Sequence, residues 1–178
     1  IAPGYTSTRV DNAANPVTTA MDAICTRIID CMAVVDTPST SREAAIAYAE
    51  DFKASLNIIA MYPAAKVFLG GEQVVRPLSP HVAAATVRRD KQVGTPFKAG
   101  WNKPLIGILG ASQRVTYRDG DTSSDANILV QAGVGTVIEN KMLWAPFNTA
   151  TDPTLKAYRS IKRIRTRRSI EKALLKAY

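Results

Sequence analysis

The 178-residue chain is poor in the side chains on which most catalytic and metal sites depend, with one histidine, His81, and two cysteines, Cys25 and Cys31. A Ser-His-Asp catalytic triad or a Cys-His dyad would need His81 as its base, and no nucleophile motif such as G-x-S-x-G occurs in the chain. One histidine and two cysteines also cannot supply a zinc site of four such ligands. We therefore expect no enzyme activity, no metal and no cofactor, with His81 structural or on the surface.

The two cysteines lie six positions apart, in a segment whose pattern indicates a helix running into a strand. An α-helix would place them about 240° apart around its axis and roughly 9 Å apart along it, too far for a disulfide without rearrangement. We expect a reduced pair that packs as small hydrophobic side chains.

Long apolar runs are also missing from the sequence. No run of about 18 apolar residues could span a membrane, and the first sixteen residues lack the basic start and apolar run of a secretory signal. The sequence therefore predicts no membrane partner. Because the chain begins at Ile1 without a methionine and stops directly after a helical pattern, we expect it to be part of something longer.

Two stretches resemble ligand-binding loops without meeting their patterns. The acidic loop 119–125 has Gly120 at its second position, where an EF-hand needs glycine at the sixth, and no glutamate closes it. Residues 105–112 contain only Gly107 and Gly110, so the phosphate-binding pattern G-x-G-x-x-G is absent. We expect a solvated turn in the first stretch and a buried strand in the second.

Length and composition favour one globular domain, because 46% of the residues are hydrophobic and 21% are charged. Helical spacing predicts helices at 16–31, 39–52, 79–94, near 124–132, and in a final segment that begins near Asp152. Apolar runs predict strands at 32–36, 56–63, 65–75 (two strands around Gly70-Gly71), 103–110, and one or two from Gly135 to Trp144. Helices alternating with strands that are apolar on both faces predict an α/β fold.

Several residues indicate where these helices begin or end. Thr40 and Glu43 have the spacing of a capping box. Ser79 is a candidate N-cap with Pro80 behind it, and Gly94 is a stop signal for the same helix.

Basic charge gathers at the end of the chain. The formal net charge is +8, and residues 159–178 contribute +7 of it, with eight basic side chains against one acid, Glu171. In the final helix, Leu155, Tyr158, Ile161 and Ile164 form an apolar line that we expect to pack on the domain. The basic side chains occupy most of the remaining circumference: Arg159, Lys162, Arg163, Arg165, Arg167, Arg168, Lys172 and Lys176.

Three functions are compatible with these observations: nucleic-acid binding, binding to an acidic protein surface, and nucleotide-dependent catalysis. The phosphates of a nucleic acid would attract the basic helix. Proteins that bind single strands, however, usually place aromatic side chains among the basic ones so that the bases stack on them, and no aromatic residue lies between Arg159 and Ala177. An acidic protein surface would use the same charge. A nucleotide-binding α/β enzyme would have to use the turn from Gly107 to Ser112.

Several stretches in order resemble one protein family. They are IAPG (1–4), VVDTP (34–38), ASLNIIAMYPAAKVF (54–68), LSPHVAAATVRRDKQVGTPFKAGWNKPLIGILG (78–110), DANILVQAGVGTVI (125–138), and LW followed by DPTLKAYRSIKRIRTRRSIEKAL. This collinear set, which covers nearly the whole chain, resembles the core of the contractile tail sheath proteins of phages, tailocins and prophage tails. One departure is the loop after Trp144, where family members commonly show Gly-Asn-Arg-Thr and this chain has Ala-Pro-Phe-Asn.

The resemblance implies a particular fold. Residues 1–178 would form a single sheath core domain, with a mixed β-sheet flanked by helices and a long basic helix at its end. Such a core is subtilisin-like in name only and has no protease activity. It would lack the N-terminal region and the C-terminal arm that family chains carry.

The resemblance also implies a function and partners. Sheath subunits polymerise as hexameric rings around the tail tube and contract to drive it through the host envelope. The partners would be other copies of the chain, a tube protein with an acidic outer surface, and the baseplate and tail terminator proteins, without membrane or direct nucleic acid. The protein would belong to the virion tail, assembled in the bacterial host cytoplasm, and the eight basic residues from Arg159 to Lys176 would supply the tube-facing surface.

Overall fold

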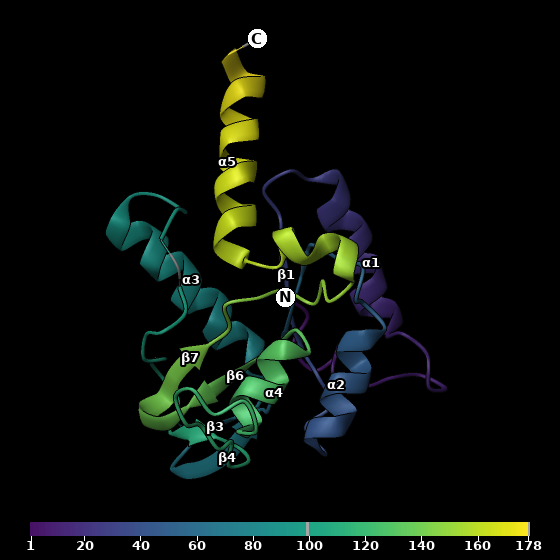
Figure 1. Cartoon of the computed structure of the whole chain (residues 1–178). Coiled ribbons are helices and arrows are strands. Elements are labelled where there is room, and N and C mark those ends of the chain that lie inside the picture. Colours follow the sequence, from purple (N-terminus) through teal and green to yellow (C-terminus); the bar gives the residue numbers. More distant parts are fainter. Residues whose placement is uncertain (99, 178) are drawn as a thin grey trace.

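The computed structural model describes residues 1–98 and 100–177 and is built around a four-stranded mixed sheet (Figure 1). The strand order is β1 (Ala33–Asp36), β2 (Ile58–Met61), β6 (Val134–Ile138) and β7 (Met142–Trp144). β1, β2 and β6 run parallel, and β7 pairs antiparallel with β6. β1, β2 and β6 are buried along their whole length, as expected for central strands covered on both faces.

Helices cover the two faces of this sheet because alternate strand residues point to opposite sides. Val35 packs with side chains of α1 (Pro16–Arg27) and α2 (Arg42–Glu50), whereas Val34 packs with side chains of α3 (Ser79–Val93). α4 (Asp125–Gln131) packs with α2 against Val134 and Ile138 of β6. Figure 1 shows α3 on one side and α1 and α2 on the other, so the predicted α/β fold with a mixed sheet flanked by helices is confirmed.

A smaller antiparallel sheet lies beside the first, in the order β4, β3, β5. β3 (Ala65–Leu69) and β4 (Glu72–Arg76) form the predicted hairpin, with Gly70 and Gly71 at φ 62° and 90° in its turn. Glycine suits this turn because other residues rarely adopt positive φ at two successive positions.

The predicted strand at 103–110 is wrong, because only Gly110–Ala111 forms a strand, β5. Leu105 and Ile108 are buried while Ile106 is 68% exposed, and the chain turns at Gly107, whose φ is 81°. The backbone N–H of Leu105 donates to Lys141 and that of Leu109 donates to Lys66, so the segment connects the two sheets.

Two predicted helix starts are also corrected. Ser41 caps α2 in place of Thr40, with its hydroxyl accepting from the N–H of Ala44 at 3.1 Å. α3 has Leu78 at its N-cap, and Ser79 is its first helical residue. The predicted stop at Gly94 is confirmed, since this residue has φ 76°.

The N-terminus of α3 is capped by Asp36, which comes from the end of β1. One oxygen of this buried carboxylate accepts from the N–H groups of Leu78 and Ser79, both at 2.8 Å, and the other accepts from the Ser79 hydroxyl at 2.6 Å. A strand of the sheet therefore supplies the cap that the sequence assigned to Ser79.

α1 ends at Arg27, four residues before the predicted end, because Ile28 adopts an extended conformation. Cys25 and Cys31 therefore do not share one helix, and their Sγ atoms lie 3.0 Å apart. The predicted separation of the two cysteines is wrong for this reason. Both are free thiols that pack in the core around Val35 and Tyr48, as expected for small hydrophobic side chains. That the pair stays reduced remains a prediction.

Candidate functional site

The basic residues of the chain's end lie on α5 (Ile161–Ala177), except Arg159, which precedes it. The predicted continuous helix from residue 153 is wrong, because a 3₁₀ helix, η2 (Pro153–Tyr158), comes first and the chain bends at Arg159 and Ser160. The N–H of Asn148 donates to the Arg159 carbonyl at 2.9 Å and that of Ile161 donates to the Pro146 carbonyl at 3.2 Å. The loop after Trp144 thus fixes the direction in which α5 leaves the domain.

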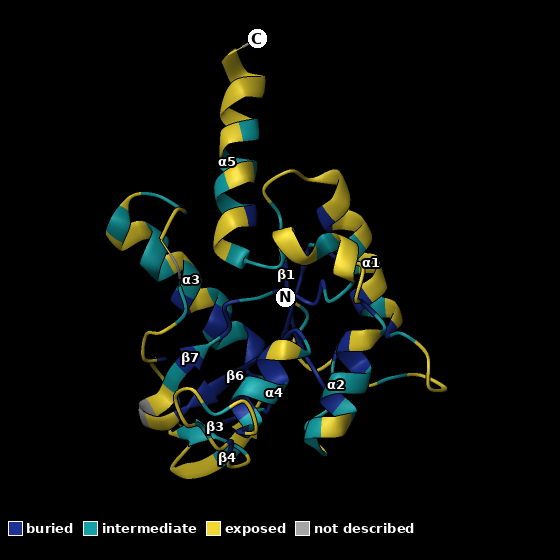
Figure 2. Cartoon of the chain, in the orientation of Figure 1, coloured by how far each residue is buried: buried dark blue, intermediate teal, exposed yellow. Residues whose placement is uncertain are grey.

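α5 projects from the body of the domain (Figure 1), and most of its length is exposed (Figure 2). Ile164 is 5% exposed, and the half-buried Ile161 packs against the core that contains Val82 and Leu143. Farther along, Ile170, Leu174 and Leu175 are exposed. Of the predicted apolar line, Ile161 and Ile164 therefore pack on the domain, whereas the prediction is wrong for Tyr158, which is 40% exposed.

One face of α5 carries three cations that contact the domain, called the inner cations below. Arg165, Arg168 and Lys172 follow one another at spacings of three and four, which places them on the same side of the helix. Arg165 pairs with Asp90 of α3, and Lys172 pairs with Asp30 in the turn after α1. Hydrogen bonding to Lys172 holds the pKa of Asp30 below its usual value.

Arg168 is the central cation of this face. Its guanidinium donates to the Cys31 carbonyl at 2.5 Å and to the Asn57 side-chain oxygen. Asn57 in turn donates to the Asp22 carboxylate at 2.7 Å. Arg168 therefore ties α5 to both α1 and the segment before β2.

Four further cations of α5 are exposed to solvent. Lys176, four positions after Lys172, continues the line of the three cations above, and the other three lie elsewhere around the helix. Lys162, Arg163 and Lys176 are exposed and form no ion pair or hydrogen bond within residues 1–98 and 100–177. Arg167 is also exposed and pairs with Glu171 at 2.7 Å, which raises the pKa of Arg167. These four exposed side chains are called the outer cations below. Of them, Arg167 also contacts η2, because its guanidinium carbon lies 5.5 Å from the centre of the Tyr158 ring.

Arg159 belongs to the domain instead. Its guanidinium carbon lies 4.8 Å from the centre of the Phe147 ring, and the same group donates to the carbonyls of Val130 and Gln131. Burial lowers the pKa of Arg159. Phe147 lies in the loop that departs from the family pattern, so that departure supplies a contact that holds Arg159 on the domain.

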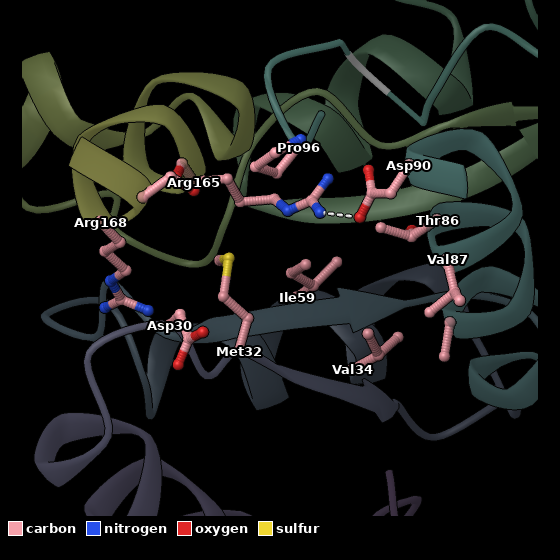
Figure 3. Close-up of a pocket in the computed structure, with 12 residues that line it drawn as sticks. Asp30, Met32, Val34, Ile59, Thr86, Val87, Asp90, Pro96, Arg165 and Arg168 are labelled. Atoms are coloured by element: carbon pink, nitrogen blue, oxygen red, sulfur yellow. Dashed lines mark hydrogen bonds and ion pairs between the residues drawn. The ribbon is translucent and has the colours of Figure 1, made fainter. Parts of the chain in front are cut away.

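A cavity of about 390 Å³ lies between α3, α5 and the sheet (Figure 3). Met32, Val34 and Ile59 form its apolar floor, and the Arg165–Asp90 pair crosses its rim. A second hollow of about 210 Å³ separates α5 from α1 on the other side. α5 is thus attached through a few polar contacts with incomplete packing beside them.

The remaining sequence candidates form no chemical site in the described part of the chain. The half-buried His81 lies beside Gly107, where an added Cβ would be 3.7 Å from the imidazole. The acidic loop closes on itself, because Asp121 accepts from the N–H and hydroxyl of Ser123. Within residues 1–98 and 100–177, no group of three histidine, cysteine or acidic residues is placed to hold a metal ion, and no helix there is long and apolar enough to cross a membrane.

The basic helix is evident in the sequence, but the acceptors that bind some of its cations and leave the others exposed are not. Asp30, Asn57 and Asp90 lie 142, 111 and 75 positions from their partners on α5. The spacing of Arg165, Arg168 and Lys172 indicated a common face, but nothing local in the sequence marks the side that meets the domain.

These features define an α/β domain from which a basic helix projects. No family model matches the chain. The chain is 29% identical to the "Putative prophage major tail sheath protein" of Pseudomonas aeruginosa (strain UCBPP-PA14), over 98% of its own length and 43% of the relative's. It therefore spans less than half of that curated relative.

Solved structures share the fold. A chain of the sheath complex of an extracellular contractile injection system, PVC, in its contracted state, superposes with a TM-score of 0.71 at 20% identity, over 93% of this chain and 45% of that one. A chain of the anti-feeding prophage (AFP) baseplate, 6-fold symmetrised, gives a TM-score of 0.59 at 17% identity, over 95% of this chain and 51% of that one. The resemblance to contractile tail sheath proteins is thus confirmed by a sequence relative, and the fold is that of chains in such assemblies.

Proposed function

We propose that this chain is the core of a structural subunit of a contractile tail sheath, which polymerises as hexameric rings around the tail tube and contracts to drive the tube through the host envelope. Residues 1–178 would act as one sheath core domain without enzymatic activity. The sequence relative and the shared fold support this assignment.

The observation that carries the proposal is the division of charge on α5. Arg165, Arg168 and Lys172 are used to hold the helix on the domain, which leaves the outer cations for a partner with an acidic surface. Of the eight residues predicted to face the tube, we therefore propose that Lys162, Arg163, Arg167 and Lys176 make the contact. Arg159 and the three inner cations would orient the helix.

The exposure of the outer cations suits a contact that must be released. Solvated ion pairs contribute only about 0 to 1 kcal/mol each, so a tube held by many such pairs can be freed along its whole length when the sheath contracts. The other partners would be neighbouring copies in the helical stack, the baseplate and the tail terminator. The assembled subunit would lie in the virion tail after assembly in the bacterial cytoplasm, with no membrane or nucleic-acid partner.

Polymerisation is tested by expressing the full-length protein that contains residues 1–178, without other tail proteins, and examining it by electron microscopy. Hollow helical tubes are the expected result. A protein that stays monomeric at high concentration would contradict the sheath assignment.

Tube binding is tested with polymer of the tail tube protein from the same tail. A triple variant, Lys162→Glu, Arg163→Glu and Lys176→Glu, is expected to lose cosedimentation with the tube, and binding of the unaltered chain should weaken as salt rises. The matched control changes net charge equally at exposed positions outside α5, with Lys98→Glu, Lys103→Glu and Arg118→Glu. Equal losses in both variants would count against a role for α5.

The nucleic-acid alternative is tested on the same proteins. Duplex and single-stranded DNA are titrated at physiological salt, where weak or absent binding is expected. Submicromolar binding with a steep salt dependence would favour nucleic acid as the partner of α5.

A further inference from the structure

Cys25 and Cys31 face each other where α1 ends and the chain turns toward β1. Their Sγ atoms are 3.0 Å apart, and both are free thiols. A disulfide requires about 2.05 Å between the sulfurs, so an approach of about 1 Å would close the bond. The turn between the cysteines already brings the two side chains together, because Ile28 leaves the helix and the N–H of Cys31 donates to its carbonyl.

We propose that Cys25 and Cys31 are a redox pair that closes to an intramolecular disulfide when the protein meets a small-molecule disulfide such as oxidised glutathione. This inference does not depend on the proposed sheath function. It assigns a modification site to a part of the molecule that the outer cations do not use.

The exchange proceeds in two steps that balance. The Cys31 thiolate attacks one sulfur of oxidised glutathione, breaks its S–S bond and releases one glutathione thiolate. The Cys25 thiol then gives up its proton to solvent, and its sulfur attacks that of Cys31 and releases the second glutathione thiolate. Two protein thiols are oxidised to one disulfide, and one glutathione disulfide is reduced to two thiols.

The surroundings of the two sulfurs decide the order of these steps. Cys31 is partly exposed, whereas Cys25 is 4% exposed. Burial, followed by the hydrogen bond with Cys31, raises the pKa of the Cys25 thiol to about 12. Cys31 is therefore the residue that a soluble oxidant reaches, and Cys25 attacks afterwards from within the protein.

The position of the pair connects its oxidation to α5. The turn that the disulfide would close contains Asp30, which pairs with Lys172, and the Cys31 carbonyl, which accepts from Arg168. Cys25 also lines the hollow between α1 and α5, together with Ile164. A disulfide would restrict the motion of this turn and should thereby stabilise the contacts of Arg168 and Lys172 with it.

The first experiment titrates the full chain with defined ratios of oxidised to reduced glutathione and measures free thiols and intact mass. We expect the loss of both thiols together, a mass decrease of two hydrogens, and a monomer on a non-reducing gel. In Cys25→Ala, Cys31 should instead keep one bound glutathione, because no second thiol can displace it. Two persistent thiols, a stable glutathione adduct on the unaltered chain, or a disulfide between chains would each overturn the proposal.

The second experiment compares hydrogen exchange in the reduced and oxidised full chain. Oxidation is expected to slow exchange several-fold in residues 28–33 and in the first half of α5. The double variant Cys25→Ala, Cys31→Ala, treated with the same glutathione mixtures, controls for effects of glutathione itself. Protection confined to residues 28–33 would overturn the connection to α5.

Discussion

At the scale of single residues, Asp36 connects the central sheet to the start of α3. The residue is 5% exposed, and its carboxylate accepts three hydrogen bonds from Leu78 and Ser79. Asp36→Ala should lower the free energy of unfolding by about 2 to 4 kcal/mol, because it leaves buried N–H groups at the helix end without acceptors. Urea denaturation followed by circular dichroism measures the change.

Two further variants separate the cap from general effects of charge. Asp36→Asn keeps one oxygen that can accept from both N–H groups, so it should lose less stability than Asp36→Ala. Glu72→Ala removes an exposed acid from β4 and should change stability by less than about 0.5 kcal/mol. Equal losses in Asp36→Ala and Glu72→Ala would contradict the assigned cap.

Gly135 is a second residue with a local role that can be tested, because β2, β6 and β7 meet closely around it. A Cβ added there would lie 2.5 Å from that of Ala145 and 2.9 Å from the Met61 sulfur. Gly135→Ala should therefore cost about 1 to 3 kcal/mol or more through overpacking of the sheet. Chemical denaturation measures the loss.

Gly110 provides the matched control for that substitution. An added Cβ at this position meets nothing within 4 Å. Gly110→Ala should leave stability within about 0.5 kcal/mol of the unaltered chain. If the two glycine variants lost the same amount, crowding at Gly135 could not be the cause.

At the scale of elements, the attachment of α5 depends on a few polar contacts. Arg168→Ala removes the bonds to Asn57 and Cys31 and should weaken this attachment by about 1 to 3 kcal/mol, as expected for hydrogen bonds from a charged donor. Amide hydrogen exchange within α5 should accelerate, while exchange in β1 and β2 stays slow. Mass spectrometry of exchanged peptides measures both.

Arg163→Ala is the control, since Arg163 lies on the same helix and is exposed. It should leave exchange in α5 almost unchanged. Faster exchange of equal size in both variants would indicate that arginine contributes to α5 through helix propensity and not through contacts with the domain.

Elements with a strong local signal were predicted from the sequence. The β3–β4 hairpin followed from Gly70-Gly71, and the end of α3 followed from Gly94. The strand predicted at 103–110 does not form, because this segment bonds to Lys141 beside one sheet and to Lys66 of the other. The spacing of apolar residues along the sequence cannot show that a segment connects two sheets. The bend at Ser160 was not predicted for a related reason. Its hydrogen bonds come from Pro146 and Asn148, which lie more than ten positions earlier in the chain.

The candidate site was predicted in the same partial way. Composition alone located the basic helix, but its division into inner and outer cations depends on Asp30, Asn57 and Asp90, which only the folded chain brings near. The Cys25–Cys31 contact depends on where α1 ends, and one residue, Ile28, decides that.

At the scale of the whole molecule, the charged groups predict how stability depends on pH. Asp30, Asp121, Asp125, Asp152 and Glu43 all have lowered pKa values, through hydrogen bonds and nearby cations. A carboxylate with a lowered folded-state pKa adds stability above its unfolded pKa, about 3.9 for aspartate and 4.3 for glutamate, and loses it as pH falls through the folded value. Unfolding should therefore become easier below about pH 4.

The alkaline limit arises from three buried groups with the opposite shift. Burial raises the pKa of Tyr48, which is fully buried and bonded to Thr18, and also that of Cys25. Burial likewise raises the pKa of Tyr62, which is 4% exposed. Such groups stabilise the fold below their unfolded pKa values, about 8.5 for cysteine and 10 for tyrosine, and this stability is lost as pH rises toward the folded values.

Reduced protein, kept in excess thiol, should consequently show a plateau in the free energy of unfolding from about pH 5 to pH 8 and a decline on both sides. Urea titrations across this range measure the profile. Cys25→Ala should make the decline begin later, nearer pH 10, because tyrosine is then the first raised group to ionise on unfolding. An unchanged alkaline limb in Cys25→Ala would show that the Cys25 thiol does not contribute to it, and the order of attack proposed for the two cysteines would lose its electrostatic basis.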